Sequence, residues 1–168
     1  MRATGTLTGI EWRERRLIEV DQINAALTEY CNELGHDSCN YTVTAKLYLS
    51  VGPRSRGAHE VVTDVFGPDA KIDECKGSLD AVVASLRQGF QFRGDAGAHP
   101  SLAFLNSSRA NAMLRSLEAA LEQLFVPYER ISSIEFESGH PFYPVFWDYA
   151  YVIQRTNEAY ILVASSSD

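Results

Sequence analysis

The chain has 168 residues and a formal net charge of −7, with 45% hydrophobic and 22% charged residues. This composition excludes a disordered chain, and the sequence contains no run of about 18 apolar residues that would span a membrane. A chain of this length buries about 70% of its unfolded surface in one core. The sequence therefore predicts a single globular domain over residues 1–168.

The acidic balance bears on the kind of partner that the chain binds. Its 22 acidic residues outnumber 15 basic ones, and a net negative field repels the phosphates of nucleic acids. The densest basic cluster, Arg13, Arg15 and Arg16, alternates with glutamates and is typical of a solvated helix face. We therefore expect a partner protein, with a basic surface favoured, and neither nucleic acid nor membrane. Self-association into a homo-oligomer is left open.

The cysteines and the N-terminus indicate a cytoplasmic protein. Residues 1–7 contain one basic residue and no apolar segment, which predicts that no secretory signal is present. The three cysteines are too few, and odd in number, for a disulfide framework, so we expect reduced thiols. Twelve arginines against three lysines are typical of a GC-rich bacterial genome.

In the N-terminal half, the residue pattern predicts four elements in chain order. Residues 1–10 alternate around threonines and form either an edge strand or a loose arm. Apolar residues at helical spacing predict a helix over residues 21–35, with a start near Arg15 as the alternative. Alternation over residues 41–50 and the apolar run 58–66 predict two strands, joined as a hairpin with a basic tip.

The C-terminal half is predicted to contain two helices and then three strands. The first helix is capped by Ser78 and ends at Phe90, and the second is capped within residues 106–108 and ends before Pro127. The three strands span residues 131–136, 145–154 and 159–164, the last two forming a hairpin. Because strands cluster in hairpins, we expect an α+β fold. Its sheet is mixed or mainly antiparallel, of about five to six strands, with three helices packed on one face.

The cysteines suggest one candidate metal site. Cys31, His36, Cys39 and Cys75 supply thiolates and an imidazole, which are ligands that zinc takes in proteins. Their spacing lacks the paired Cys-x2-Cys units of zinc motifs, and Cys31 lies on an apolar helix stripe, where a free cysteine packs as a small hydrophobe. The sequence also lacks a phosphate-binding loop and a dinucleotide-binding fingerprint, so we expect no metal and no cofactor.

Two His-x-Ser units provide a candidate catalytic site. The pairs are His36 with Ser38 and His99 with Ser101, and this pattern resembles the paired His-x-Thr/Ser motif of the 2H phosphoesterases. The resemblance implies two imidazoles acting as acid and base on a phosphate, with the hydroxyls holding its oxygen. In that family each motif lies on a strand, whereas here a glycine precedes one unit and a proline interrupts the other. Cys39 is an alternative nucleophile, because an adjacent imidazole can lower the pKa of its thiol.

A carboxylate on a predicted strand provides a second catalytic candidate. Asp148 lies between apolar neighbours, where a carboxylate needs a cation or a hydroxyl as partner. It is either a structural anchor or a site acid whose pKa burial raises. His140, just upstream, is its expected companion.

Aromatic residues concentrate between residues 139 and 151. Prolines stiffen the entry to this segment, and the two-residue period of the strand that follows directs its large rings to one face. Aromatic side chains with a polar atom are enriched in protein contact surfaces. The alternative is that both faces of this strand are covered. The residues predicted to form a contact surface are Phe142, Tyr143, Trp147, Tyr149 and Tyr151.

Two classes of function fit these observations. The first is an acidic interaction module, such as an inhibitor or immunity-type protein, that binds a partner protein through its aromatic C-terminal β region. The second is a small hydrolase or phosphoesterase that uses His36, His99 or His140 with nearby hydroxyls. The first is favoured because the sequence contains none of the nucleophile or phosphate-binding motifs that would identify an enzyme.

Overall fold

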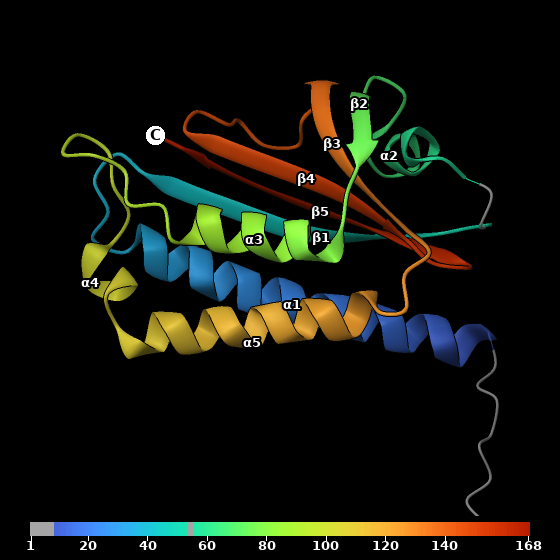
Figure 1. The fold of residues 1–168 in the computed structure, drawn as a ribbon, viewed down its shortest axis with the longest axis horizontal. Coiled ribbons are helices and arrows are strands. Elements are labelled where there is room, and N and C mark those ends of the chain that lie inside the picture. Colours follow the sequence, from blue (N-terminus) through green and yellow to red (C-terminus); the bar gives the residue numbers. More distant parts are fainter. Residues whose placement is uncertain (1–8, 54–55) are drawn as a thin grey trace, which may run out of the picture.

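The computed structural model describes residues 9–53 and 56–168, which form five helices and one five-stranded sheet (Figure 1). The helices are α1 (Gly9–Gly35), α2 (Ala58–Phe66), α3 (Leu79–Phe90), α4 (Leu102–Leu105) and α5 (Ser108–Phe125). The strands are β1 (Thr42–Val51), β2 (Lys71–Lys76), β3 (Arg130–Ser138), β4 (Trp147–Gln154) and β5 (Glu158–Ser167). All neighbouring strands are antiparallel, so the α+β class is confirmed.

The strand order is β1-β5-β4-β3-β2, which places the last strands of the chain at the centre of the sheet. β4 and β5 form the predicted hairpin, in which the Arg155 N–H donates to the Glu158 carbonyl over 2.8 Å. Every residue of β5 except Ser167 is buried, because side chains pack on both of its faces. β1 and β2 are therefore the two edges of the sheet.

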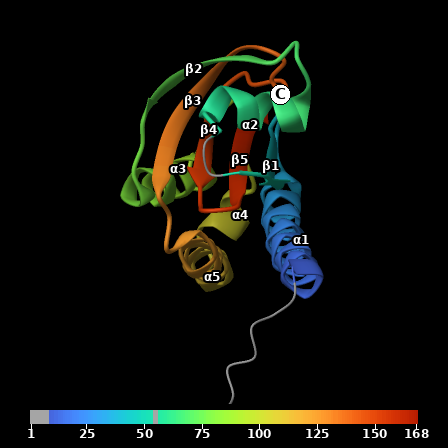
Figure 2. The same cartoon turned by 90° about the vertical axis from the view of Figure 1, so that its right-hand side faces the viewer.

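Helices lie on both faces of the sheet. On one face, α1, α3, α4 and α5 enclose the larger core, which includes Leu27, Phe90 and Phe125 (Figures 1 and 2). On the other face, α2 packs over a smaller apolar cluster with Val62 at its centre. The three predicted helices, α1, α3 and α5, lie on one face, but α4 joins them there and α2 lies on the other face, so the count of three is not confirmed. In the part of the chain that the structure describes, no helix is long and apolar enough to cross a membrane.

The region predicted as a second strand, residues 58–66, is instead the helix α2. Its buried residues Ala58, Val61 and Val62 recur at helical spacing, and Glu60 accepts a hydrogen bond of 2.7 Å from the Gly57 N–H at the helix start. The β-branched valines favour a strand locally. The capping interaction and the apolar face outweigh that preference, so the predicted hairpin does not exist.

Two short elements were not predicted, and one helix is longer than predicted. β2 buries only Ile72, because it is a charged edge strand, and α4 is a single turn capped by Ser101. α1 begins at Gly9, well before either predicted start. The predicted edge strand or arm falls mainly on residues 1–8, which lie outside the described residues.

Side chains of α1 close the free edge of β1. The Asn24 carboxamide donates to the Leu47 carbonyl and accepts from the Leu47 N–H, both over 2.8 Å. About two helical turns further along α1, the Cys31 sulfur accepts a hydrogen bond from the Ala45 N–H. At Leu47 and Ala45, backbone groups that an unpaired edge strand would offer to another chain are thereby occupied.

Candidate interaction surface

Part of the sheet face on the α3 side is not covered by helices. β2 and the C-terminal half of β3 extend past α3 and away from the helix layer (Figures 1 and 2). Ile131 of β3 packs in the larger core, and side chains alternate along a strand, so Glu135 points to the same side, while Glu137 lies at the register shift that ends this alternation. Both glutamates are exposed. This uncovered part of the sheet is a surface available to a partner.

Two carboxylates lie directly opposite each other on this surface. Asp73 of β2 is paired in register with Glu135 of β3, and both side chains are exposed. Among the described residues, no cation lies within ion-pair distance of Asp73, Glu135 or Glu137. Like charges at directly opposite positions of an antiparallel pair are destabilising. We call these three residues the acidic surface.

On the opposite face of the same strands, the carboxylate of Glu74 is compensated. Glu74 of β2 accepts a hydrogen bond of 2.6 Å from the Ser132 hydroxyl and another from the Arg130 guanidinium. The His59 ring of α2 lies 3.8 Å from the Glu74 carboxylate. Asp73 and Glu74 are adjacent on β2 but have different surroundings. Among the described residues, Glu74 has polar partners on the α2 face, whereas Asp73 has no cationic partner on the α3 face.

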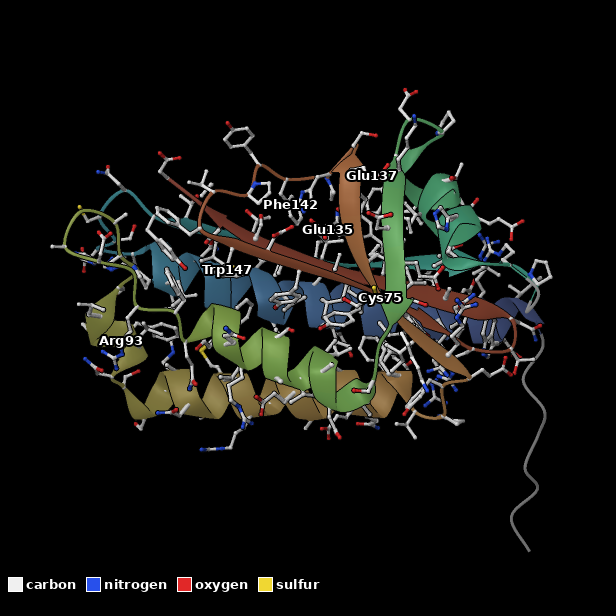
Figure 3. All side chains as sticks on the ribbon, turned by 45° about the horizontal axis from the view of Figure 1, so that its top comes forward. Cys75, Arg93, Glu135, Glu137, Phe142 and Trp147 are labelled. Carbon is white, nitrogen blue, oxygen red and sulfur yellow. The ribbon has the colours of Figure 1, made fainter. Side chains whose placement is uncertain are left out.

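An exposed aromatic patch lies at the start of β4. Tyr143 is 79% exposed, and Phe92 and Phe146 are 37% and 36% exposed. The Phe146 ring centroid lies 5.5 Å from that of the buried Tyr41 and 6.5 Å from that of Phe92. Figure 3 places Trp147 at this end of β4, with Glu135 and Glu137 further along the molecule on β3. Large exposed rings at neighbouring positions are typical of a contact surface.

Trp147 and Tyr149 form the half-buried floor next to this patch. Their rings stack at a centroid distance of 5.7 Å, and the Trp147 indole N–H donates to the Tyr41 hydroxyl over 2.8 Å. A Cβ atom on Gly89 would lie 2.9 Å from the indole, so α3 approaches this closely only because residue 89 is glycine. The Tyr149 hydroxyl is buried without a hydrogen-bond partner among the described residues, and burial raises its pKa well above the usual value. The orientation of both rings is therefore fixed by packing.

The five aromatic residues predicted to form one surface are divided among three environments. Tyr151 belongs to the larger core, where its hydroxyl lies 2.8 Å from the Ser85 hydroxyl. Phe142 packs against the smaller core on the α2 face. Trp147 and Tyr149 are half-buried on β4, and Tyr143 is exposed in the loop that precedes β4, so for these three a contact surface stays a prediction.

Sequence reasoning missed the residues that complete this surface. Phe92 and Phe146 were not selected, and neither were the acidic residues Asp73, Glu135 and Glu137. Phe146 precedes β4 and does not follow the alternation of that strand, since its ring contacts Tyr41. The Asp73–Glu135 pairing depends on the β2–β3 register, and the sequence pattern did not predict β2. The Glu-x-Glu spacing at residues 135 and 137 was the one available signal, because in a regular strand it places two carboxylates on one face, although the register shift at Glu137 interrupts that alternation here.

The predicted contact between His140 and Asp148 is present. The His140 Nε2 lies 3.6 Å from an oxygen of Asp148, although it makes no hydrogen bond within the described residues. The His140 ring also contacts Phe136 edge-on at 5.0 Å, and its Nδ1 lies 2.9 Å from the Phe142 N–H. The ring therefore fills the space between β3 and β4 where their pairing ends beyond Ile134. Its Nε2 is buried, so a substrate does not reach it.

The two His-x-Ser units lie side by side, but their hydroxyls are used locally. Cys39 and His99 pair through backbone hydrogen bonds of 3.0 and 2.9 Å, which brings the two segments together. The Ser38 hydroxyl donates to the Gly35 carbonyl, and the Ser101 hydroxyl caps α4. The His36 ring lies 3.0 Å from the Asp37 carboxylate and lines a groove that neither His99 nor His140 borders.

The candidate metal ligands occupy separate places. Cys31 is buried under β1, and burial raises the pKa of its thiol to about 12. His36 is exposed at the end of α1, Cys39 contacts the Gly97 carbonyl, and Cys75 is exposed on β2 (Figure 3). Within residues 9–53 and 56–168, no group of three or more His, Cys, Asp and Glu side chains is arranged to hold a metal ion.

Comparison with known proteins gives no relative. No model of a known protein family matches the chain, and no curated protein is significantly similar to it in sequence.

Proposed function

We propose that this protein is an interaction module that binds a basic partner protein through the acidic surface and the adjoining aromatic patch. The observation that carries the proposal is the uncompensated pair formed by Asp73 and Glu135. Two carboxylates held opposite each other lower the stability of the free protein, and a cationic group placed between them removes that repulsion. Positions that reduce stability without a local compensation are characteristic of functional sites.

The aromatic patch supplies the apolar part of the same contact. Protein interfaces are enriched in aromatic residues at their centre and have a polar rim. Tyr143, Phe146 and Phe92 are exposed, while Trp147 and Tyr149 on the following strand are held by packing. A partner that covers these rings buries apolar area without reordering the floor of the patch. The acidic surface then sets the orientation and increases the rate of encounter with a basic partner.

Site-specific photocrosslinking in the organism that encodes the protein tests this proposal. A photoreactive phenylalanine analogue at Tyr143, which is 79% exposed, is expected to crosslink a discrete basic protein. The same analogue at Ser116 on α5, which is also exposed, serves as the control and is expected not to crosslink it.

Charge reversal decides whether the crosslink reports the proposed surface. Glu135→Lys/Glu137→Lys is expected to abolish it, because a basic partner is then repelled. Glu14→Lys/Glu122→Lys changes the net charge equally at exposed helix positions and is expected to preserve it. A crosslink that survives the first double substitution, or no crosslink from Tyr143, contradicts the proposal.

A further inference from the structure

β2 is the edge of the sheet that α1 does not close. It pairs with β3 alone, and no strand of the described chain lies beyond it (Figure 2). The Gly77 N–H donates to the Ile131 carbonyl over 2.9 Å. In an antiparallel pair, the backbone N–H and carbonyl groups of every second residue point toward the partner strand. Since Gly77 points toward β3, the backbone groups of Ile72, Glu74 and Lys76 point away from it.

The contacts of α2 support this assignment and limit the open stretch. The Ile72 carbonyl, one of the outward groups, lies 3.0 Å from the His59 Nε2. The outward N–H and carbonyl groups of Glu74 and Lys76 remain. A hollow of about 650 Å³ is lined by residues 74–78 together with residues 128–131 of the neighbouring β3 segment, so it lies toward β3 and leaves the free edge of β2 unchanged. That edge therefore has backbone hydrogen-bonding capacity at two residues, Glu74 and Lys76.

From these features we infer that the partner binds by adding an extended basic segment to β2. This inference rests on the proposed function, because the same acidic surface is used. In an added strand, one residue lies directly opposite Asp73 and on its face of the sheet. A lysine or arginine there compensates Asp73 and lies one strand away from Glu135. Main-chain hydrogen bonds to Glu74 and Lys76 give affinity, and the charge opposite Asp73 gives specificity.

A second copy of the chain does not fit this edge. An antiparallel pair of two β2 strands joins outward groups to outward groups and keeps each face on one side, so the two central registers place Asp73 opposite Asp73 or Glu74 opposite Glu74. In both registers the directly opposed charges have like sign, which is destabilising. Charged side chains on a short edge strand prevent indiscriminate pairing. On β2 they select against self-association and in favour of a basic strand.

Two synthetic peptides separate strand addition from electrostatic binding. The probe is an acetylated and amidated hexapeptide of alternating lysine and valine. The second is the same peptide with methyl groups on the amide nitrogens that face β2. The unmethylated peptide is expected to slow hydrogen exchange of the Glu74 and Lys76 amides. Methylation is expected to weaken binding about tenfold or more, because two or three hydrogen bonds are lost.

Two results overturn the inference, and they differ in what they say about the proposed function. If both peptides bind equally and Asp73→Asn/Glu135→Gln weakens both, the acidic surface binds cations without strand addition. The inference then fails and the proposed function stands. If the unmethylated peptide leaves exchange at Glu74 and Lys76 unchanged up to millimolar concentration, the inference also fails. The crosslinking experiment at Tyr143 then tests the proposed function independently.

Discussion

The two edge strands of the sheet, β1 and β2, are protected in different ways. β1 is ten residues long, carries a single charged side chain, Lys46, and has its free edge occupied by Asn24 and Cys31 of α1. β2 is six residues long and mostly charged, and α1 does not reach it. A long apolar edge needs a dedicated cover, whereas a short charged edge is excluded from non-specific pairing by its side chains.

This difference separates structural from functional roles along the sheet. At β1, polar groups of the helix satisfy the backbone and nothing is left unpaired at Leu47. At β2, the α2 side is compensated around Glu74, while Asp73 on the other side opposes Glu135 with no cation from the described residues within ion-pair distance. The β1 edge, which α1 covers, contributes to stability. The β2 edge, which α1 leaves open, carries the like-charged pair of Asp73 and Glu135 on which the proposed function rests.

The largest difference between the edges is expected in thiol reactivity. Cys31 lies under β1 and Cys75 is exposed on β2. Since burial raises the pKa of Cys31 to about 12, only about one molecule in 10,000 carries its thiolate at pH 8. An aromatic disulfide reagent is expected to modify Cys75 at once and Cys31 only on unfolding. The control variant Cys75→Ser is expected to remove one rapidly reacting thiol. Rapid reaction of Cys31 in the folded protein would contradict its burial between α1 and β1.

Removal of the Asn24 amide is expected to cost the most stability. Asn24→Ala leaves the Leu47 N–H and carbonyl without their protein partner, which lowers the free energy of unfolding by about 2 kcal/mol. Urea denaturation measures this change. Asn32→Ala, at an exposed position of the same helix, is the control and is expected to change stability by less than about 0.5 kcal/mol. Equal effects of the two substitutions would refute the role of Asn24 at the β1 edge.

On β2, the compensated carboxylate is expected to contribute moderately. Glu74→Ala removes the acceptor of the Ser132 hydroxyl and the Arg130 guanidinium, and it lowers the free energy of unfolding by about 1.5 kcal/mol. Part of that loss is recovered because the exposed Arg130 is rehydrated. The measurement is urea denaturation at pH 7. A stabilising effect would mean that the α2 face is no better compensated than the acidic surface.

Reversal of the charge at Asp73 is expected to have a smaller effect of opposite sign. Asp73→Lys replaces a like-charge pair by an attractive pair with Glu135, and it raises the free energy of unfolding by about 1 kcal/mol. The same substitution is expected to abolish the crosslink formed from Tyr143. Increased stability with undiminished partner binding would show that the acidic pair is not part of the contact.

The fold class and most elements could be predicted from the sequence because their patterns are local. The Ser78 cap, the apolar stripe ending at Phe90 and the β4–β5 hairpin depend on residues a few positions apart. The prediction of a strand over residues 58–66 was wrong because the valines of α2 favour a strand locally, although their spacing is helical. β2 was not predicted because it has one buried residue, Ile72, and a single apolar residue shows no alternation.

The candidate surface was predictable only in part, for the same reason. Tyr143 and Trp147 stand out by composition; the first is exposed and the second half-buried, and their role in a contact surface stays a prediction. The Asp73–Glu135 pair joins positions 62 residues apart through strand register, which no local pattern specifies. Tyr151 could not be distinguished from Tyr149 by alternation. Both rings lie against α3, Tyr149 at Gly89 and Tyr151 at Ser85, and only the packing of the folded chain distinguishes them.

A double-mutant cycle on Asp73 and Glu135 tests the central claim most directly. Urea denaturation of Asp73→Asn, Glu135→Gln and the double variant gives the coupling energy between the two side chains. We expect each single substitution to raise the free energy of unfolding by about 0.5 kcal/mol and the double variant to add little more, which corresponds to a repulsive coupling. Two destabilising single substitutions with an attractive or absent coupling would contradict the claim that the free protein holds an uncompensated site for a cationic partner.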